Sequence, residues 1–307
     1  MKIGVVCNHH FGLNAINYLA ANKLIVGIAV PGINMQLIMQ LKQFSESGGI
    51  SLITVTKETL QDDLKNWLES IHADAVFVFS FPFRIPETLL NIPKHGFINF
   101  HPSPLPLYRG PDPLFWQIKN GETSTGITAH QMNKNFDRGP VLFFESETIT
   151  PNETYGFLES KLSFTLIRAV IGLLNLLQNN TPIPLVEQKE KDVSYFTRPT
   201  EKDLIIYWQN QNAVSVCNLV RACNPKFQGV VTSIRGTPLR ILQVTLTGEK
   251  LESPTPGTIL NDSTGNLKVV CADNNVLIID IVYIQEGCFS GKVFKEIFNI
   301  QNGEVFV

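Results

Sequence analysis

Residues 97–111 read FINFHPSPLPLYRGP, an apolar run that ends in polar groups and continues into four prolines and a glycine. Apolar residues alternate with Asn99 and His101, which is the period of a strand, so the amide and the imidazole share one face. The prolines exclude both a helix and a central strand for the segment that follows. We therefore predict a strand over 97–101 that presents an amide and an imidazole beside a stiff loop.

A second stretch, MNKNFDRGP at 132–140, places a carboxylate in a turn. Asp137 precedes Gly139-Pro140, a turn-forming pair, and residues 125–130 have the pattern of a short strand. A carboxylate there would hold the His101 ring and raise its basicity. Ligands of open α/β sheets bind outside the carboxyl ends of the strands, so these groups are candidates for a catalytic site.

Length and composition bound the class of protein. The chain has 307 residues, 44% of them hydrophobic and 17% charged, which is enough for a full core and two domains. A formal net charge of -2 gives no global attraction to nucleic acid or anionic membrane. No run of 18 apolar residues occurs, and the opening MKIGVV enters a strand, so neither a membrane helix nor a signal peptide is expected. The five cysteines lack CxxC spacing, which favours reduced thiols in a cytoplasmic protein.

Strand and helix patterns alternate through the first half of the chain. This order predicts a doubly wound, Rossmann-like α/β sheet. The wholly apolar strand at 75–80 is typical of a parallel sheet covered on both faces. Besides 97–101 and 125–130, we expect strands at 2–7, 24–30, 50–55, 75–80 and 141–150, and helices at 13–21, 35–48, 57–72, 86–90, 113–119 and 154–178.

The chain changes character toward residue 200. Asparagine and proline residues at 179–184 are predicted to end the long helix, and 185–200 to form a linker. We therefore expect a catalytic domain over 1–184 and a second domain over 201–307. In the second domain, the sequence pattern predicts a helix followed by a small antiparallel barrel or sandwich. The helix is expected at 212–222, and the strands at 230–234, 238–245, 257–260, 267–271 and 276–285.

Several spaced elements together carry a family resemblance. The chain has the pattern Asn99-x-His101-x-Ser103-x-Leu105-Pro106-x-Tyr108-Arg109-Gly110, followed by Gly121-Glu122-Thr123 and Asp137-x-Gly139-Pro140. This pattern closely resembles the formyltransferases that use 10-formyltetrahydrofolate. Residues 221–225 with Gly229 are similar to the opening of the C-terminal domain of methionyl-tRNA formyltransferases, and Gly291-Lys292, Phe298 and Gly303 to its end. The resemblance spans nearly the whole chain and implies a Rossmann-like formyltransferase domain followed by a smaller OB-like β-barrel.

The resemblance also implies an activity and a set of roles. The enzyme would move the formyl group of 10-formyltetrahydrofolate to a primary amine, without a metal. His101 would be the general acid/base between the attacking amine and folate N10, Asn99 would donate to the oxyanion, and Asp137 would orient His101. The folate would lie against two loops and the turn after the key strand, formed by Phe83, Arg84, Ile85, Ser103, Pro104, Leu105, Pro106, Asn133, Lys134, Asn135 and Phe136.

Each of these features also has a purely structural explanation. A single histidine on a strand is more often structural than catalytic, Asp137 could simply form a turn, and the rings at 81–86 could simply pack a loop. The joint spacing of Asn99, His101 and Asp137 favours catalysis over a folate-binding module without activity.

Two departures from the family leave the acceptor open. Methionyl-tRNA formyltransferases usually carry a long basic loop after the second strand, whereas this chain has only residues 31–34 there, with no lysine or arginine between Lys23 and Lys42. Residues 201–307 hold nine Lys/Arg and ten Asp/Glu, although a tRNA-binding domain should be basic. A local basic patch could still arise from Arg221, Lys226, Arg235 and Arg240. The acceptor is therefore either initiator methionyl-tRNA or a small amine such as a nucleotide-linked amino sugar.

Overall fold

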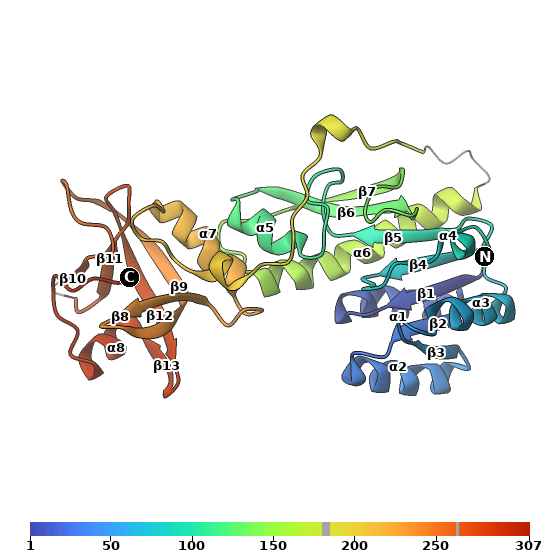
Figure 1. Cartoon of the computed structure of the whole chain (residues 1–307), viewed down its shortest axis with the longest axis horizontal. Helices are drawn as coiled ribbons and strands as arrows, with labels where there is room; N and C mark the ends of the chain where they lie inside the picture. Colours follow the sequence, from blue (N-terminus) through green and yellow to red (C-terminus); the bar gives the residue numbers. More distant parts are fainter. Residues whose placement is uncertain (180–184, 262–263) are drawn as a thin grey trace. The chain divides into compact units, whose positions relative to one another are not determined.

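The structure, a computed structural model, describes residues 1–179, 185–261 and 264–307 (Figure 1). The chain divides into two compact units. Unit 1 comprises Met1–Pro113, Ser124–Thr148 and Glu159–Phe196, and unit 2 comprises Leu114–Thr123, Ile149–Leu158 and Thr197–Val307. Residues 180–184, where we predict the break after the long helix and the end of the first domain, lie outside the described residues. The domain boundaries at 184 and 200 stay predictions.

Unit 1 is built on one sheet with the strand order β3-β2-β1-β4-β5-β6-β7. The neighbours from β3 to β5 are parallel, which confirms the Rossmann-like parallel sheet predicted from the alternating pattern. Every residue of β1 and β4 is buried, as expected for central strands covered on both faces. The strands are β1 Ile3–Cys7, β2 Ile25–Pro31, β3 Ser51–Val55, β4 Ala75–Phe79, β5 Phe97–His101, β6 Ser124–Gln131 and β7 Val141–Thr148.

The last two strands run against the rest of the sheet. β6 is antiparallel to β5, and β7 is antiparallel to β6. The pairing places His130 opposite Asn99 and Thr128 opposite His101. Apolar periodicity predicts that a strand exists but not its direction, so this pairing could not be predicted from the sequence.

Helices cover the sheet of unit 1. α3 turns one apolar stripe to the sheet and contributes Leu64 and Trp67, with 0% and 2% exposure, to a core shared with strand residues such as Val76. On another part of unit 1, α1 and α6 are joined by a hydrogen bond from Asn14 to Ser163 at 2.9 Å. The helices are α1 Leu13–Ala21, α2 Met35–Gly48, α3 Leu60–Ile71, α4 Glu87–Leu90 and α6 Tyr155–Gln178, and the short 3₁₀ turns are η1 His10–Gly12 and η2 Glu190–Asp192.

Helix α6 has the length and apolarity of a membrane span. Half of that stretch is buried inside the structure. Leu162, Leu166 and Val170 are each 0% exposed, which is typical of a core helix.

Unit 2 carries an antiparallel sheet with the strand order β10-β11-β12-β9-β8, and β13 pairs with β12. This confirms the predicted antiparallel sheet after residue 200, although β9 and β12 are long strands of 14 and 10 residues. The sequence did not predict β13 or the helix α8 that follows it. The elements are α5 Pro113–Lys119, η3 Glu201–Leu204, α7 Ala213–Cys223, β8 Val230–Ile234, β9 Thr237–Lys250, β10 Ile259–Asn261, β11 Leu267–Val270, β12 Asn275–Ile284, β13 Gly287–Ser290 and α8 Gly291–Ile297.

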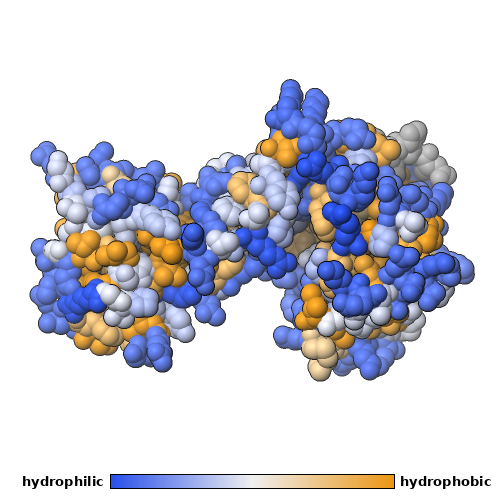
Figure 2. Space-filling view, viewed as in Figure 1, coloured by the Kyte–Doolittle hydropathy of each residue, from blue (hydrophilic) through white to orange (hydrophobic). Residues whose placement is uncertain are grey.

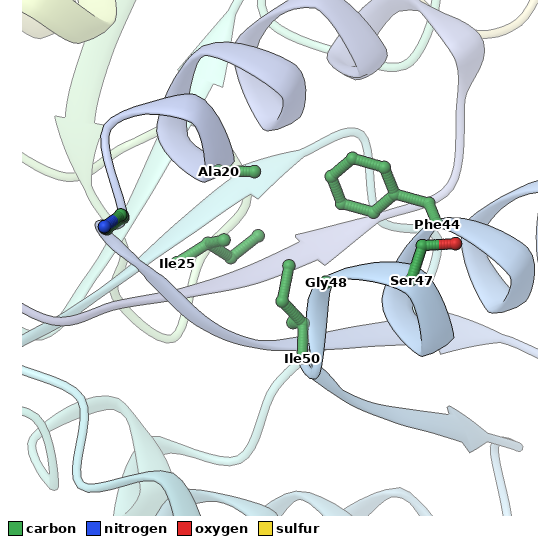
Figure 3. Close-up of a pocket in the computed structure, with 7 residues that line it drawn as sticks. Ala20, Ile25, Phe44, Ser47, Gly48 and Ile50 are labelled. Atoms are coloured by element: carbon green, nitrogen blue, oxygen red, sulfur yellow. The ribbon is translucent and has the colours of Figure 1, made fainter.

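The surface of unit 1 has a hollow of about 370 Å³ between α1 and α2 (Figure 3). Its lining includes Ile25, which opens β2, and Ile50, which precedes β3. The hollow therefore lies at the amino edge of the parallel strands, whereas His101 ends β5 at the carboxyl edge. In the view of Figure 2, polar colour covers most of both units and apolar colour forms separate islands.

Candidate active site

The key strand places its two polar side chains as the alternation predicts. Ile98 and Phe100 are 0% and 2% exposed and fill the core. Asn99 is half-buried, and His101 is 5% exposed at the last position of β5. The amide and the imidazole therefore stand at the carboxyl edge of the sheet, where ligands of such folds bind.

The ring of His101 is held at both nitrogens. Its Nε2 lies 2.8 Å from the backbone oxygen of Tyr108, and its Nδ1 lies 3.6 Å from Oδ1 of Asp137. A carbonyl oxygen can only accept, so Nε2 carries a hydrogen and donates it to Tyr108. This leaves Nδ1 facing the carboxylate.

Asp137 is the centre of the constellation. Its backbone is left-handed, with φ 55°, and its side chain is 12% exposed. The Gly110 amide donates to Oδ2 at 3.0 Å, and Oδ1 lies 3.7 Å from Nε2 of His130. Burial by itself would raise the pKa of Asp137, but the neighbouring His101 and His130 imidazoles and the Gly110 amide together hold that pKa well below its usual value. Asp137 is therefore a stable carboxylate.

His130 belongs to the same constellation, although the sequence reasoning did not select it. It is 2% exposed, and its Nδ1 donates to the Gln131 carbonyl at 3.2 Å. Its Nε2 then accepts from Nδ2 of Asn99 at 3.1 Å, which fixes the orientation of that amide. The signal that could have found it is strand alternation, which places Thr128 and His130 on one face of β6.

The turn after β5 is fixed by buried hydroxyl groups. Ser103, at 0% exposure, donates to the Leu107 carbonyl at 2.8 Å. Thr128 donates to the Ser103 carbonyl at 2.6 Å and accepts from the Leu105 amide at 3.2 Å. The predicted contact residues Pro104, Leu105 and Pro106 are partly exposed, with a cis peptide bond before Pro106, whereas the Ser103 side chain shapes the turn from inside.

The structure brings the other two predicted folate segments together. The Arg84 guanidinium lies 5.5 Å from the ring centre of Phe136, which is 46% exposed. Phe83 is half-buried and packs edge-on against Phe81, with ring centres 5.5 Å apart. Ile85 is 2% exposed, so its side chain belongs to the core.

The loop before Asp137 is mostly exposed. Asn133, Lys134 and Asn135 are all exposed, and the Asn133 side chain accepts from the Asn135 amide at 2.9 Å. Their polar groups are therefore open to a ligand.

The cysteines and the possible metal ligands of the chain are the other groups to compare with this constellation. All five cysteines are free, as predicted, and burial raises the pKa of Cys7 to about 12, which keeps it an inert thiol. Within residues 1–179, 185–261 and 264–307, no group of three or more His, Cys, Asp or Glu side chains is arranged to hold a metal ion. An amide donor, two imidazoles and a carboxylate suit proton transfer at a polarised carbonyl.

Comparison with known proteins identifies the family. Residues 35–174 match the formyl transferase family, and residues 199–288 match the formyl transferase C-terminal domain. The methionyl-tRNA formyltransferase of Geotalea uraniireducens is 32% identical over 243 residues, covering 78% of this chain and 75% of that protein.

The chain belongs to the formyltransferase family.

Two solved structures share the fold of this formyltransferase. An N-formyltransferase from Helicobacter canadensis, solved with folinic acid and dTDP-3-aminofucose, has a TM-score of 0.69 at 19% identity and covers 91% of this chain and 98% of that one. HypX from Aquifex aeolicus, solved with tetrahydrofolic acid, has a TM-score of 0.62 at 15% identity and covers 97% of this chain and 47% of that one. The formyltransferase is an enzyme that uses 10-formyltetrahydrofolate as its formyl donor and a primary amine as its acceptor.

Proposed function

We propose that this formyltransferase acts on initiator methionyl-tRNA. The proposal is supported by the Geotalea uraniireducens relative and by a methionyl-tRNA formyltransferase of Dictyoglomus thermophilum, which is 34% identical over 66% of this chain. The single observation that carries the chemistry is the buried Asp137 carboxylate, 3.6 and 3.7 Å from two imidazoles, beside the Asn99 amide.

His101 is the general acid/base in this proposal. It takes the proton that the attacking amine loses and supplies a proton to N10 of the departing tetrahydrofolate. Asp137 stays ionised and stabilises the imidazolium form of His101 across 3.6 Å. General acid–base help of this kind accelerates a reaction by roughly 100- to 10,000-fold.

Asn99 stabilises the oxyanion of the tetrahedral intermediate. One hydrogen of its Nδ2 points at His130, which leaves the second hydrogen for the oxyanion. A single positioned donor of this type contributes roughly 3 kcal/mol to transition-state stabilisation. His130 fixes the amide so that its nitrogen, rather than its oxygen, is presented.

The folate site in this proposal is formed by the two loops and the turn described above. The exposed Phe136 ring under Arg84 offers a flat apolar surface to the pterin or the aryl ring, and the Asn133–Asn135 loop offers polar groups. Pro104, Leu105 and Pro106 form the stiff wall beside His101. We also infer that the enzyme is cytoplasmic, needs no metal, and folds its second unit as an OB-like barrel.

A nucleotide-linked amino sugar is the alternative acceptor, and specific observations favour it. Ile33, in the short segment where a basic loop would be expected, and Met35 and Met39, in the first turns of α2, are 62%, 59% and 65% exposed. The Helicobacter canadensis structure holds an amino sugar nucleotide.

The four basic residues that could form a local patch in unit 2 are engaged by the protein itself, which also weakens the case for a tRNA-binding patch. Arg235 pairs with Glu304 at 2.6 Å, and Arg240 donates to the Phe227 carbonyl at 2.9 Å. Arg221 donates to the Glu153 carbonyl at 2.9 Å. Lys226 donates to the Tyr155 hydroxyl at 2.8 Å, so all four candidate cations have partners within unit 2.

The experiment that separates these acceptors is a side-by-side transfer assay. Release of tetrahydrofolate from 10-formyltetrahydrofolate is followed with charged initiator tRNA, with a panel of nucleotide-linked amino sugars, and with water alone. We expect turnover with charged tRNA. Turnover with a sugar and none with tRNA would show that the acceptor is a nucleotide-linked amino sugar. Release of tetrahydrofolate with water alone would contradict formyl transfer to an amine.

A further inference from the structure

Residues 186–196, which we call the strap, run along the catalytic loops of unit 1 and hydrogen-bond to them. At one end, Val186 and Val141 exchange two backbone hydrogen bonds of 3.0 and 2.8 Å. At the other end, the Arg109 amide donates to the Ser194 carbonyl at 2.9 Å. The strap is therefore anchored at both ends to the chain that carries the site.

A buried guanidinium binds the strap between these ends. Arg109 is 1% exposed, and its Nε and Nη2 donate to Oε1 of Gln188 at 3.0 and 2.8 Å. Arginine can only donate hydrogen bonds, so it fixes the Gln188 amide with its oxygen toward Arg109 and its NH₂ group away.

That NH₂ group donates hydrogen bonds to two backbone carbonyls in the turn that carries the Asp137 carboxylate. Nε2 of Gln188 donates to the Asp137 carbonyl at 3.0 Å and to the Gly139 carbonyl at 2.7 Å. Asp137 has a positive φ of 55°, which an L-residue keeps only where its surroundings hold it. Gln188 supplies two of the hydrogen bonds that hold this conformation.

The strap also fixes the second partner of His101. The Tyr108 amide donates to Oγ of Ser194 at 2.8 Å, and the Tyr108 ring stacks on Phe196 with centres 5.2 Å apart. The carbonyl of Tyr108 receives the His101 ring. Both groups that orient His101, the Tyr108 carbonyl and the Asp137 carboxylate, are thus held from the strap.

We propose that Arg109 and Gln188 are positioning residues, which keep Asp137 aligned with His101 without contacting either substrate. The inference rests on the catalytic role proposed for Asp137. Such positioning can matter for the rate, because a displacement of about 1 Å at a reacting group can lower a rate by about 100-fold.

The first test is the substitution Gln188→Ala. We expect kcat for formyl transfer to fall by about 10- to 100-fold, because Asp137 is released. The KM for 10-formyltetrahydrofolate should stay close to the wild-type value. Gln188→Glu is the second variant: it keeps a partner for Arg109 but turns oxygens toward two carbonyls, so it should lose kcat at least as strongly. Glu187→Gln, a change at the exposed neighbour on the strap, is the matched control and should keep wild-type kcat.

The decisive test places Gln188→Ala in an Asp137→Asn background. If Gln188 acts only by positioning the Asp137 carboxylate, its loss has no further effect once that carboxylate is removed. The double variant should therefore be no slower than Asp137→Asn alone. Thermal unfolding of each protein shows whether it is folded. A wild-type kcat in both Gln188 variants, or an equal loss with and without the Asp137 carboxylate, would overturn the inference while leaving the role of Asp137 intact. Wild-type activity in Asp137→Asn would instead overturn the catalytic role that the proposed function gives to Asp137.

Discussion

In the proposed mechanism His101 is the acid/base, and its two ring nitrogens face the Tyr108 carbonyl and the Asp137 carboxylate. Replacing it by asparagine keeps a polar group of smaller size but removes the imidazole that exchanges the proton in this mechanism. We expect His101→Asn to lower kcat for formyl transfer by about 100- to 10,000-fold. Binding of 10-formyltetrahydrofolate, measured by calorimetry, should survive, and an unchanged kcat would rule out His101 as the acid/base.

Gly139 sets the position of Asp137 from the other side of the turn. A Cβ at this residue would collide with the backbone oxygen of Gln131, and a backbone atom of a strand cannot move aside. We expect Gly139→Ala to lower both the melting temperature and kcat. The matched control is Gly32→Ala, where the nearest atom to an added Cβ is 3.4 Å away on a threonine side chain. Equal behaviour of the two variants would show that the 137–140 turn is not constrained in this way.

His130 shows where sequence reasoning reaches its limit at the level of single residues. Asn99, His101 and Asp137 could be selected because strand alternation, proline placement and turn chemistry are local signals. The role of His130 depends on the antiparallel pairing of β6 with β5, which no local pattern encodes. A buried histidine in an apolar strand is usually structural, and only its contacts with Asn99 and Asp137 distinguish it here.

An ion cluster joins β7 to α6 and gives these elements a pH dependence. Glu147 accepts from Arg168 at 2.8 Å and from Thr165 at 2.9 Å, and Lys161 lies 3.6 Å away. Burial raises the pKa of Glu147, but the Arg168, Thr148 and Thr165 hydrogen bonds and the Lys161 charge together lower it from 4.5 to about 2. A carboxyl with a lowered pKa in the folded state stabilises the fold above its unfolded pKa, and this contribution is lost as the pH falls from 4.5 toward 2.

We therefore expect Glu147→Gln to lower the melting temperature at pH 7. The difference from wild type should shrink steadily below pH 4.5. Thermal unfolding at a series of pH values measures this difference. Glu46→Gln, a change at an exposed residue of α2, serves as the control and should show little difference at any pH. A Glu147 effect that did not depend on pH would mean that ionic pairing is not what stabilises this contact.

Sequence patterns predicted the elements of unit 1 better than those of unit 2. The strands β1 to β5 begin and end within one residue of their predicted bounds, because buried parallel strands are continuous apolar runs between turn signals. The helix α8, Gly291–Ile297, was missed because a helix of this length has too few turns to show an apolar period. The sequence predicts a linker over 185–200 and does not reveal the strap, because the contacts of the strap with unit 1 are made by backbone groups, by the polar side chains of Gln188, Glu190 and Ser194, and by the single Phe196 ring.

At the scale of the whole molecule, the proposed acid/base groups all belong to unit 1, while the acceptor question concerns the charge of the entire chain. A net charge of -2 and the engaged arginines of unit 2 do not indicate a strongly basic surface for phosphates. A protein that makes 6–10 phosphate contacts loses roughly 1,000- to 100,000-fold in affinity between about 50 and 200 mM salt. We expect kcat/KM for charged tRNA to fall by less than about tenfold over that range. A steep salt dependence would reveal a basic tRNA-binding face that these contacts do not indicate.

Direct transfer of a labelled formyl group would test the proposed activity as a whole. Wild-type enzyme and His101→Asn are incubated with 10-formyltetrahydrofolate labelled in the formyl carbon and with charged initiator tRNA, and the label on the methionyl amine is counted. We predict label on the amine with the wild-type enzyme and a loss of at least about 100-fold with the variant. Equal labelling by both proteins would contradict the proposed site, and no labelling by the wild-type enzyme would contradict methionyl-tRNA as the acceptor.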